Sequence, residues 1–582
     1  MNPFSENALK VLDSRYLRRN LKGKLTETPD ELLMRVAKAV AAAELEWGTN
    51  SDAQKWQVIF YESMKNLLFL PNSPALMNAG TSLNQLSACF VLPIEDNLDS
   101  IFTTLKNAAL IQQSGGGTGF NFSHLRPAHD LISITGGEAS GPVSFMKVFN
   151  AATEHVKHGG KRRGANMGIL NVDHPDIEEF VLSKKDEKAL NNFNISVGIT
   201  DKFMEAVEKD DTWKLVHPNS KSIAKTIKAK DLWKLIIENA WAGGDPGLVF
   251  LDTINAGNPL LSLGKIECTN PCGEVPLLPY ESCNLGSINL SNFVEPDKGK
   301  NSINFTKLGS TIEMAIRFLD NVIEVNHYLL GETKSIVSAN RKIGLGVMGW
   351  ADLLIKLEIP YDSEEAISLA GRVMNFFKEK SLAASVKLAK QRGVFKNWEK
   401  SIFYPDTRLR NATRLSIAPT GTISIIANTS SSIEPLFAIA YQRSHVLDGS
   451  TLSEVNPLFI DHLKRNKLYS ESLMDEVSES GYLQHIRQIP IATRNLFKTA
   501  LEISPAWHLK HQVAFQQYVD NAVSKTINLA ETASFNDIED IYFNAWRQKT
   551  KGITIFRYNS KHAQVLEKGI SKSEKAWKVC ID

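Results

Sequence analysis

A cysteine flanked by an amide and a carboxylate is the strongest chemical signal in the sequence. In Thr269-Asn270-Pro271-Cys272-Gly273-Glu274, Asn270 stands two residues before Cys272 and Glu274 stands two residues after it. In an extended loop, alternate side chains project to the same side. We therefore expect an amide, a thiol and a carboxylate to surround one small ligand. The alternative interpretation is a buried structural cysteine in a turn that contains proline and glycine.

The other cysteines lie far apart along the chain, at Cys89, Cys268, Cys283 and Cys580. Five cysteines in 582 residues are too few and too scattered for a disulfide scaffold. This pattern favours a cytosolic protein whose thiols can react. Two thiols can supply two electrons by closing a disulfide, and a carboxylate is suited to general-base catalysis.

A second candidate site lies in Ala418-Pro419-Thr420-Gly421-Thr422-Ile423-Ser424, after a strand-like run. Small and hydroxyl-bearing residues leave backbone N–H groups and Oγ atoms available to hold an anion, especially where a helix begins nearby. The alternative is an ordinary turn between a strand and a helix. No P-loop lysine motif occurs, and Ser114-Gly115-Gly116-Gly117-Thr118-Gly119 does not complete GxGxxG because Phe120 follows it. Common hydrolase and dehydrogenase functions therefore have no support.

The elements that must position these residues alternate between short apolar runs and longer amphipathic segments, which predicts an α/β domain. The expected strands are Cys89 to Ile94, Ile195 to Ile199, Gly247 to Leu251, Ile343 to Met348, Leu415 to Ile417 and Ile553 to Tyr558. The expected helices are Leu98 to Gln112, Ser144 to Val156, Lys307 to His327 and Glu364 to Lys390. Before them, Thr28-Pro29-Asp30-Glu31 forms a capping box at the start of a helix. We expect a helical N-terminal region over 1–85, one large α/β domain over 86–560 and a polar tail over 561–582.

Composition excludes several classes of protein. The 43% of hydrophobic and 22% of charged residues are typical of a globular protein, and the formal net charge is +2. A nearly neutral chain has no global field for binding a nucleic acid. No apolar run approaches the length of a membrane span, and the charged N-terminus is unlike a signal peptide. We therefore expect no nucleic-acid partner, no membrane association and a cytoplasmic location.

The motifs together resemble the catalytic subunit of ribonucleotide reductases. The resemblance covers nearly the whole chain, from Phe4-Ser5-Glu6-Asn7-Ala8 to Gly552-Ile553-Thr554-Ile555-Phe556-Arg557. It implies a ten-stranded α/β barrel with a central finger loop that carries Cys272, preceded by a helical N-terminal region. It also implies a ribonucleoside-diphosphate reductase that makes 2′-deoxyribonucleotides for DNA synthesis. The sequence alone leaves open whether diphosphates or triphosphates are the substrates.

The resemblance assigns a role to each residue of the constellation. Cys272 would become the thiyl radical that abstracts the 3′-hydrogen of the ribose, and Glu274 would take the proton of the 3′-hydroxyl group. Asn270 would donate hydrogen bonds to the ribose hydroxyls. Cys89 and Cys283 would be the dithiol that closes to a disulfide as the 2′-hydroxyl leaves as water. A thioredoxin-like protein or another dithiol would then reduce that disulfide.

Substrate and effector contacts follow from the same resemblance. The implied substrate-binding residues are Ser73, Ala88, Pro419, Thr420, Gly421, Thr422 and Ile423. The implied contacts of a deoxynucleoside triphosphate effector are Asp96, Arg126, Lys161 and Arg162. Gly136 to Pro142 and Gly159 to Met167 resemble two specificity loops, although a solvated basic loop also explains Lys161-Arg162-Arg163. Phe145, Val148, Phe149, Ala152 and Val156 would share one helical face, which fits either a homodimer interface or core packing.

The source of the radical divides this family into classes. The oxygen-dependent class carries a Tyr-Tyr pair near the C-terminus, and the anaerobic class carries a glycyl-radical motif. This sequence has neither. The short cysteine spacing and both chain ends resemble the adenosylcobalamin-dependent class, so adenosylcobalamin is the expected cofactor. The alternatives are the large subunit of an oxygen-dependent reductase and a non-catalytic nucleotide-binding homologue. Relatives carry a C-terminal cysteine pair, whereas only Cys580 stands near this end. We also expect no N-terminal ATP-binding cone.

Overall fold

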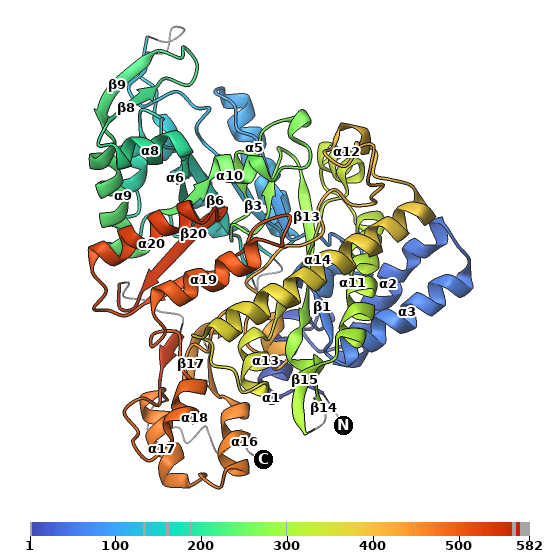
Figure 1. Cartoon of the computed structure of the whole chain (residues 1–582). Helices are drawn as coiled ribbons and strands as arrows, with labels where there is room; N and C mark the ends of the chain where they lie inside the picture. Colours follow the sequence, from blue (N-terminus) through green and yellow to red (C-terminus); the bar gives the residue numbers. More distant parts are fainter. Residues whose placement is uncertain are drawn as a thin grey trace.

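The structure is a computed structural model that describes residues 3–131, 136–158, 162–186, 188–297, 299–447, 450–560 and 566–570. Its N-terminal region is helical and comprises α1 (Glu6–Val11), α2 (Pro29–Ala41) and α3 (Asn50–Lys65). Thr28 and Glu31 form the expected capping box of α2, and Thr49 and Asp52 form a second one at α3. Helices α2 and α3 lie side by side against the barrel domain (Figure 1).

A ten-stranded sheet forms the centre of the molecule, with the order β1-β13-β2-β3-β6-β7-β10-β20-β19 and with β16 also paired to β13. The strands are β1 (Phe69–Pro71), β2 (Cys89–Val91), β3 (Gly117–Asn121), β6 (Asn166–Asn171), β7 (Phe193–Ile199), β10 (Gly247–Phe250), β13 (Ser282–Asn289), β16 (Ile343–Met348), β19 (Thr526–Leu529) and β20 (Gly552–Arg557). Strands β2, β3, β6, β7 and β10 are parallel neighbours and make one half. Strands β13 and β16 are parallel, as are β19 and β20, and they belong to the other half.

The two halves close into a barrel. They meet in antiparallel fashion where β13 pairs with β2 and where β10 pairs with β20. Parallel bridges from Leu345 to Leu415 and from Ile417 to Val523 connect β16, through the segment at 415–417, to the chain that leads into β19. The segment predicted as a strand from Leu415 to Ile417 therefore completes the circuit. The predicted ten-stranded α/β barrel is confirmed.

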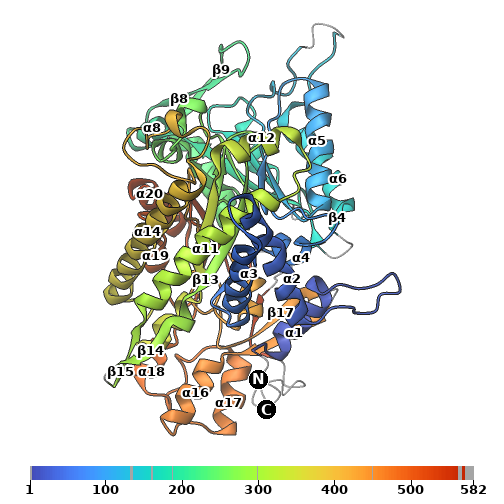
Figure 2. The same ribbon diagram turned by 90° about the vertical axis from the view of Figure 1, so that its right-hand side faces the viewer.

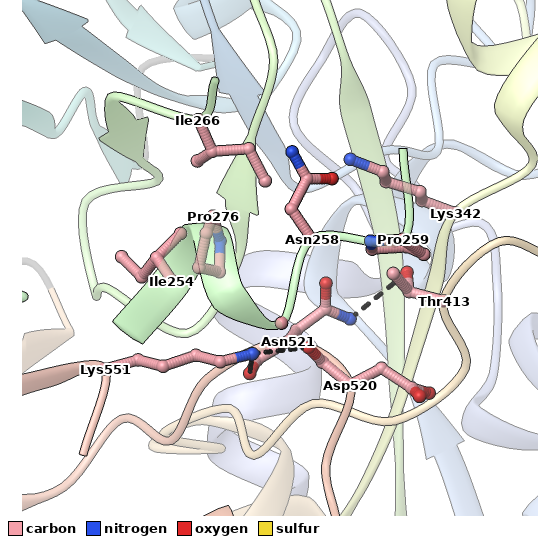
Figure 3. A pocket seen from close by; sticks show the side chains of 11 residues that line it. Ile254, Asn258, Pro259, Ile266, Pro276, Lys342, Thr413, Asp520, Asn521 and Lys551 are labelled. Atoms are coloured by element: carbon pink, nitrogen blue, oxygen red, sulfur yellow. Dashed lines mark hydrogen bonds between the residues drawn. The ribbon is translucent and has the colours of Figure 1, made fainter. Parts of the chain in front are cut away.

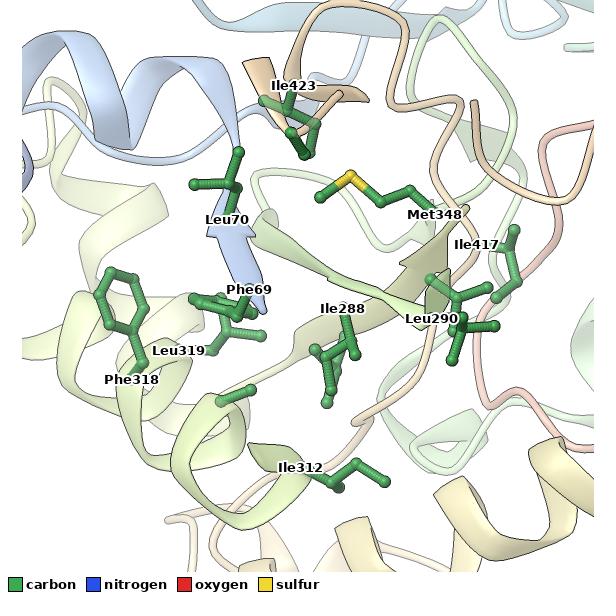
Figure 4. Packing of buried hydrophobic residues seen from close by; sticks show 14 of the residues in the cluster. Phe69, Leu70, Ile288, Leu290, Ile312, Phe318, Leu319, Met348, Ile417 and Ile423 are labelled. Carbon is green, nitrogen blue, oxygen red and sulfur yellow. The ribbon is translucent and has the colours of Figure 1, made fainter. Parts of the chain in front are cut away.

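Helices cover the outside of the barrel. Long α11 (Phe305–Val325) and α14 (Glu364–Arg392) pack against each other, and α11 also contacts β13 and β16. Phe69, Ile288, Leu319 and Met348 fill the core between β1, β13, β16 and α11 (Figure 4). The other helices of eight or more residues in this domain are α5 (Leu98–Gln113), α6 (Gly141–His155), α8 (Asp201–Glu208), α9 (Ala229–Gly243), α12 (Gly331–Asn340), α19 (Pro505–Gln516) and α20 (Phe535–Arg547). All four predicted helices form, with ends within three residues of the prediction.

A small unit with its own core projects from the barrel, at the bottom of Figure 1. It contains α16 (Pro457–Arg465), α17 (Glu471–Ser480) and α18 (Ile491–Leu496). Its three-stranded sheet has the order β18 (Ser450–Val455), β17 (Ala440–Leu447) and β21 (Leu566–Lys568). We did not expect a strand at β21, which lies in the predicted polar tail; it forms because its backbone pairs with β17. Among the described residues, no helix combines the length and apolar character needed to cross a membrane.

Candidate active site

A short hairpin carries Cys272. Strand β11 (Cys268–Thr269) pairs with β12 (Pro276–Leu277), and residues 270–275 form the tip. The backbone N–H of Val275 donates to Asn270 Oδ1 at 2.9 Å, and the N–H of Gly273 donates to the Asn270 carbonyl at 3.0 Å. Gly273 has a φ of +81°, a conformation that favours glycine.

The tip is a tight turn, so the prediction of an extended loop is wrong. The left-handed conformation of Gly273 and the Asn270 side-chain bond reverse the chain within the motif. As a result Asn270 and Glu274 are buried while Cys272 is exposed. The turn still keeps an amide and a carboxylate on either side of the thiol.

The hairpin lies inside the barrel because it contacts both halves. The Asn194 amide of β7 donates to the Pro271 carbonyl at 2.7 Å. On the other side, Ser416 Oγ and the Ala522 N–H donate to the Glu274 carbonyl at 2.8 and 2.9 Å. A Cβ at Gly119 of β3 would lie 1.8 Å from the Thr269 carbonyl oxygen, so only glycine fits there. The glycine-rich segment before Phe120 thus provides clearance for this finger.

Cys89 and Cys283 lie directly opposite each other where β2 and β13 pair. Cα atoms of opposite residues in antiparallel strands are about 4.5–5.5 Å apart, within the range of a disulfide. Both side chains are buried, and the Asn270 amide donates to Cys89 Sγ at 3.2 Å. The structure therefore brings Cys89, Cys283, Asn270, Cys272 and Glu274 into one cluster at the fingertip. Cys268 is a buried thiol at the base of the finger.

Burial changes the acidity of this cluster. It raises the pKa of Glu274 to about 7, against the opposing effect of the Asn270 side chain. Glu274 Oε2 is buried and has no hydrogen-bond partner among the described residues. A buried carboxyl oxygen without a partner is costly unless a ligand supplies a donor. Burial also raises the pKa of the Cys89 and Cys283 thiols well above the usual range, so both are protonated at neutral pH.

The predicted phosphate loop lies near the C-terminal end of β16, where the Gly349 N–H donates to the Ser430 carbonyl at 2.8 Å. Thr420 has a φ of +51°, and its Oγ1 accepts the Ser432 N–H at 2.7 Å. Residues Ile423–Ile426 form the short helix α15, which packs against α1. Gly421 faces open space, while Pro419 and Thr422 flank the turn. Figure 4 shows Ile423 on the same side of the core as Leu70.

Ser73 and Ala88 also lie near this barrel. Ser73 begins α4 (Ser73–Asn78) just after β1, and its Oγ is 2.7 Å from the Tyr16 hydroxyl. Ala88 lies between the two halves: its N–H donates to the Cys283 carbonyl, and its own carbonyl accepts the Gly117 N–H. We did not predict the contact of Tyr16, because nothing in the local sequence indicates that the N-terminal region reaches Ser73.

The predicted effector residues Asp96 and Arg126 contact each other beside the start of α5. Arg126 Nε donates to Asp96 Oδ2 at 2.8 Å, and its backbone N–H donates to Oδ1 at 3.1 Å. Asn219, in the turn between β8 (Thr212–Val216) and β9 (Ile223–Lys228), also donates to Asp96 Oδ2 at 2.7 Å. We did not predict Asn219, which is distant in sequence. Lys161 lies outside the described residues, and only the backbone of Arg162, in β5 (Arg162–Arg163), is described.

Two family models match the chain. The model described as "Ribonucleotide reductase, barrel domain" matches residues 87–408 and 406–556, and "Ribonucleotide reductase, all-alpha domain" matches residues 2–84. The chain belongs to the ribonucleotide reductase family. The predicted family membership is therefore confirmed.

Curated relatives and a solved structure agree with this assignment. The chain is 48% identical to the vitamin B12-dependent ribonucleoside-diphosphate reductase of Thermoplasma acidophilum, across 98% of this chain and 81% of the relative. It is 49% identical to the protein of that name from Mycobacterium tuberculosis, across 97% and 81%. The class Id ribonucleotide reductase alpha subunit of Actinobacillus ureae has the same fold, with a TM-score of 0.77 at 24% identity over 96% of this chain and 98% of that one.

Proposed function

We propose that this reductase converts ribonucleoside diphosphates to 2′-deoxyribonucleoside diphosphates by a thiyl-radical mechanism that depends on adenosylcobalamin. The observation that carries the proposal is the fingertip inside the barrel, where exposed Cys272 stands between buried Asn270 and Glu274 and near the Cys89–Cys283 pair. The names of the curated relatives support both the diphosphate substrate and the cofactor.

Each residue of the fingertip has a distinct task. The Cys272 thiyl radical takes the 3′-hydrogen atom of the ribose, and the Glu274 carboxylate takes the 3′-hydroxyl proton. Glu274 Oε2 suits this role because no described residue donates a hydrogen bond to it. The Asn270 amide, which contacts Cys89 Sγ, orients the ribose hydroxyls. Cys89 and Cys283 then supply two electrons and two protons as the 2′-hydroxyl leaves as water, and they close to a disulfide.

The exposure of Cys272 fits the requirement for a separate radical source. Adenosylcobalamin, when bound, supplies the organic radical that removes the hydrogen atom from the Cys272 thiol. Asn270 and Glu274 are buried on either side, so the thiol is the fingertip group that an external radical can reach. Ser73 and the loop from Pro419 to Ile423 hold the substrate phosphates.

Effector binding is proposed at the start of α5, with Asp96, Arg126, Lys161 and Arg162 as contacts.

An apolar surface supports a homodimer in which α5 and α6 face a second copy of the chain. Leu98, Phe102 and Leu110 of α5 and Val148 of α6 are exposed, and the two helices lie side by side (Figure 2). The same helix α6 buries Met146 and Phe149 in the core, so Phe149 and Val148 do not share one face as predicted.

Anaerobic turnover tests the proposal. Purified protein, a ribonucleoside diphosphate and dithiothreitol should give the deoxynucleotide only when adenosylcobalamin is added. An oxygen-dependent reductase would instead need a second, radical-generating subunit. A non-catalytic homologue would bind nucleotides and form no product under either condition. A cytoplasmic location and a thioredoxin-like reductant complete the proposal, since the disulfide must be reduced in each turnover.

A further inference from the structure

A buried ion pair lies beside Cys283 and has no part in the chemistry above. Lys342 Nζ and Glu281 Oε2 are 2.6 Å apart, and the side chains are 2% and 1% exposed. Glu281 also accepts hydrogen bonds from the Asn340 amide and the Leu278 N–H. Removing two charges from water is costly, and such pairs often give no net stabilisation. The position of the pair suggests another use.

Cys89, Cys283 and Lys342 lie in one row across three neighbouring strands. Cys283 is opposite Cys89 in the β13–β2 pairing. Asn284 is opposite Ile343 in the parallel β13–β16 pairing, so Lys342, one residue earlier, continues the register beside Cys283. Neighbours in register project from the same face of a sheet. A Cβ at Gly344, two residues after Lys342, would lie 3.7 Å from Cys283 Sγ, which places this face of β16 against the thiol.

The two sulfur atoms have different surroundings. Cys89 Sγ accepts the Asn270 amide and so faces the fingertip. Cys283 is next to Lys342, which borders a small cavity at the base of the finger with Pro276, Asn521 and Lys551 (Figure 3). The ionisable groups that act on Cys283 from the elements packed around it are Cys89, Glu274, Glu281, Tyr328 and Lys342.

We propose that Lys342, held in place by Glu281, is a positioning residue that stabilises the thiolate of Cys283 when the Cys89–Cys283 disulfide is reduced. The inference rests on the function proposed above. A thiolate of the reductant attacks Cys89 Sγ and forms a mixed disulfide, the Cys89–Cys283 bond breaks, and Cys283 leaves with the electron pair. The second reductant thiolate then releases Cys89, the reductant becomes a disulfide, and both cysteines take up protons from solvent.

Electrostatics favour this role. Burial raises the pKa of the Cys283 thiol, which makes its thiolate a poor leaving group. The positive charge of Lys342 opposes that effect more strongly than the negative charge of Glu281 reinforces it. A lysine in register with the leaving sulfur therefore assists the one step in which negative charge develops there.

The test follows reduction of the disulfide directly. Enzyme that has completed one anaerobic turnover is treated with dithiothreitol from about pH 6 to pH 9, and free Cys89 and Cys283 are counted by alkylation and mass spectrometry. Lys342→Met should slow this reduction by about three- to tenfold and move its pH profile to higher pH. Lys342→Met should slow the first turnover of prereduced enzyme by a smaller factor than it slows the reduction. Lys342→Arg, which retains the charge, should stay within about twofold of the wild type.

Two further variants keep the result interpretable. Lys184→Met breaks a partly buried pair with Asp245, on the other half of the barrel, and should leave the reduction rate unchanged. If Lys342→Met does not fold, Lys342→Met combined with Glu281→Gln removes both charges and should still reduce slowly. A folded Lys342→Met variant with the wild-type rate and pH profile overturns the inference. A wild type that forms no Cys89–Cys283 disulfide after turnover overturns the proposed function instead.

Discussion

The Cys272 thiol is exposed on a turn whose neighbours are buried, and this contrast defines its chemistry. Replacing Cys272 by Ser changes the side-chain volume little, but the O–H bond is too strong to give the required radical. We expect Cys272→Ser to abolish formation of deoxynucleotide and to leave nucleotide affinity within about twofold of the wild type. Product assays and equilibrium binding measure the two quantities. Normal turnover by this variant would remove Cys272 from the mechanism.

The buried carboxyl group of Glu274 predicts the pH dependence. Its pKa is raised to about 7, so the group is mostly protonated below that pH and mostly ionised above it. Since the carboxylate is the form that accepts a proton, the rate with saturating adenosylcobalamin should rise with pH through about 7 and then level off. Glu274→Gln should lose this acid limb and lower kcat by about 10²–10⁴-fold. A variant that retains the wild-type profile would show that another group is the base.

At the scale of elements, the finger depends on the absence of side chains in the strands around it. A Cβ at Gly119 would lie 1.8 Å from the Thr269 carbonyl oxygen, and a Cβ at Gly346 would lie 2.2 Å from the Ser416 carbonyl oxygen. These backbone oxygens cannot move away from an added Cβ, whereas the end of a flexible side chain could. Gly119 therefore limits how close the finger lies to β3, and Gly346 lets the segment at Ser416 approach β16, although neither glycine takes part in the chemistry.

Gly119→Ala should displace the finger from β3 and lower kcat by at least about tenfold, because catalysis is sensitive to shifts of about 1 Å. Gly243→Ala is the matched control, since that glycine lies in α9 and a Cβ there meets nothing within 4 Å. The control should keep wild-type activity and thermal stability. Equal kcat values for the two variants would show that the finger tolerates the displacement.

Elements with strong local patterns could be predicted from the sequence, and those defined by distant contacts could not. Helix α14 has a clear amphipathic pattern, and both α5 and α14 matched their predictions within two residues at each end. Strand β3 was missed because its sequence, Gly117 to Asn121, has glycines where a strand usually has apolar side chains. The glycines are explained only by the finger that packs against them.

The residues of the candidate site also divide into those that local sequence predicts and those that only distant contacts define. The cluster of Cys272, Asn270 and Glu274 was predictable because the three residues are adjacent in sequence. The register of Cys89 opposite Cys283 spans two strands far apart in sequence, so only the resemblance to a family pointed to the pair. Asn219 and Lys342 were missed because no local motif marks them, and their contacts depend on the folded arrangement of β8, β9, β13 and β16.

At the scale of the whole molecule, buried charges connect the helical N-terminal region to the barrel domain. Arg392 of α14 donates to Asp320 Oδ2 of α11 and to Glu44 Oε1 of the N-terminal region, each at 2.7 Å. Asp320 also accepts from Arg341, and Trp47 stacks on the Arg392 guanidinium at 4.2 Å. Although burial alone would raise it, the surrounding arginines Arg341, Arg410 and Arg392 hold the pKa of Asp320 well below its ordinary value.

The ionised state of Asp320 therefore contributes stability that is present above the pKa of an unfolded aspartate, about 3.9. This contribution is lost only as the pH falls below that value toward the lower folded pKa. At neutral pH Asp320 is ionised. Removing a single partner from the network should destabilise the folded state strongly, because it leaves a buried charge without compensation.

Arg392→Met should lower the free energy of unfolding by about 3–5 kcal/mol at neutral pH, because Glu44 and Asp320 would both lose a buried partner. Lys387→Met is the control on the same helix. Its partner Glu313 is about half exposed, so the loss should be at most about 1 kcal/mol. Urea unfolding followed by tryptophan fluorescence measures both. If the two variants unfold at the same urea concentration, the network does not hold the N-terminal region to the barrel, and apolar packing of α2 and α3 against α11 must do so.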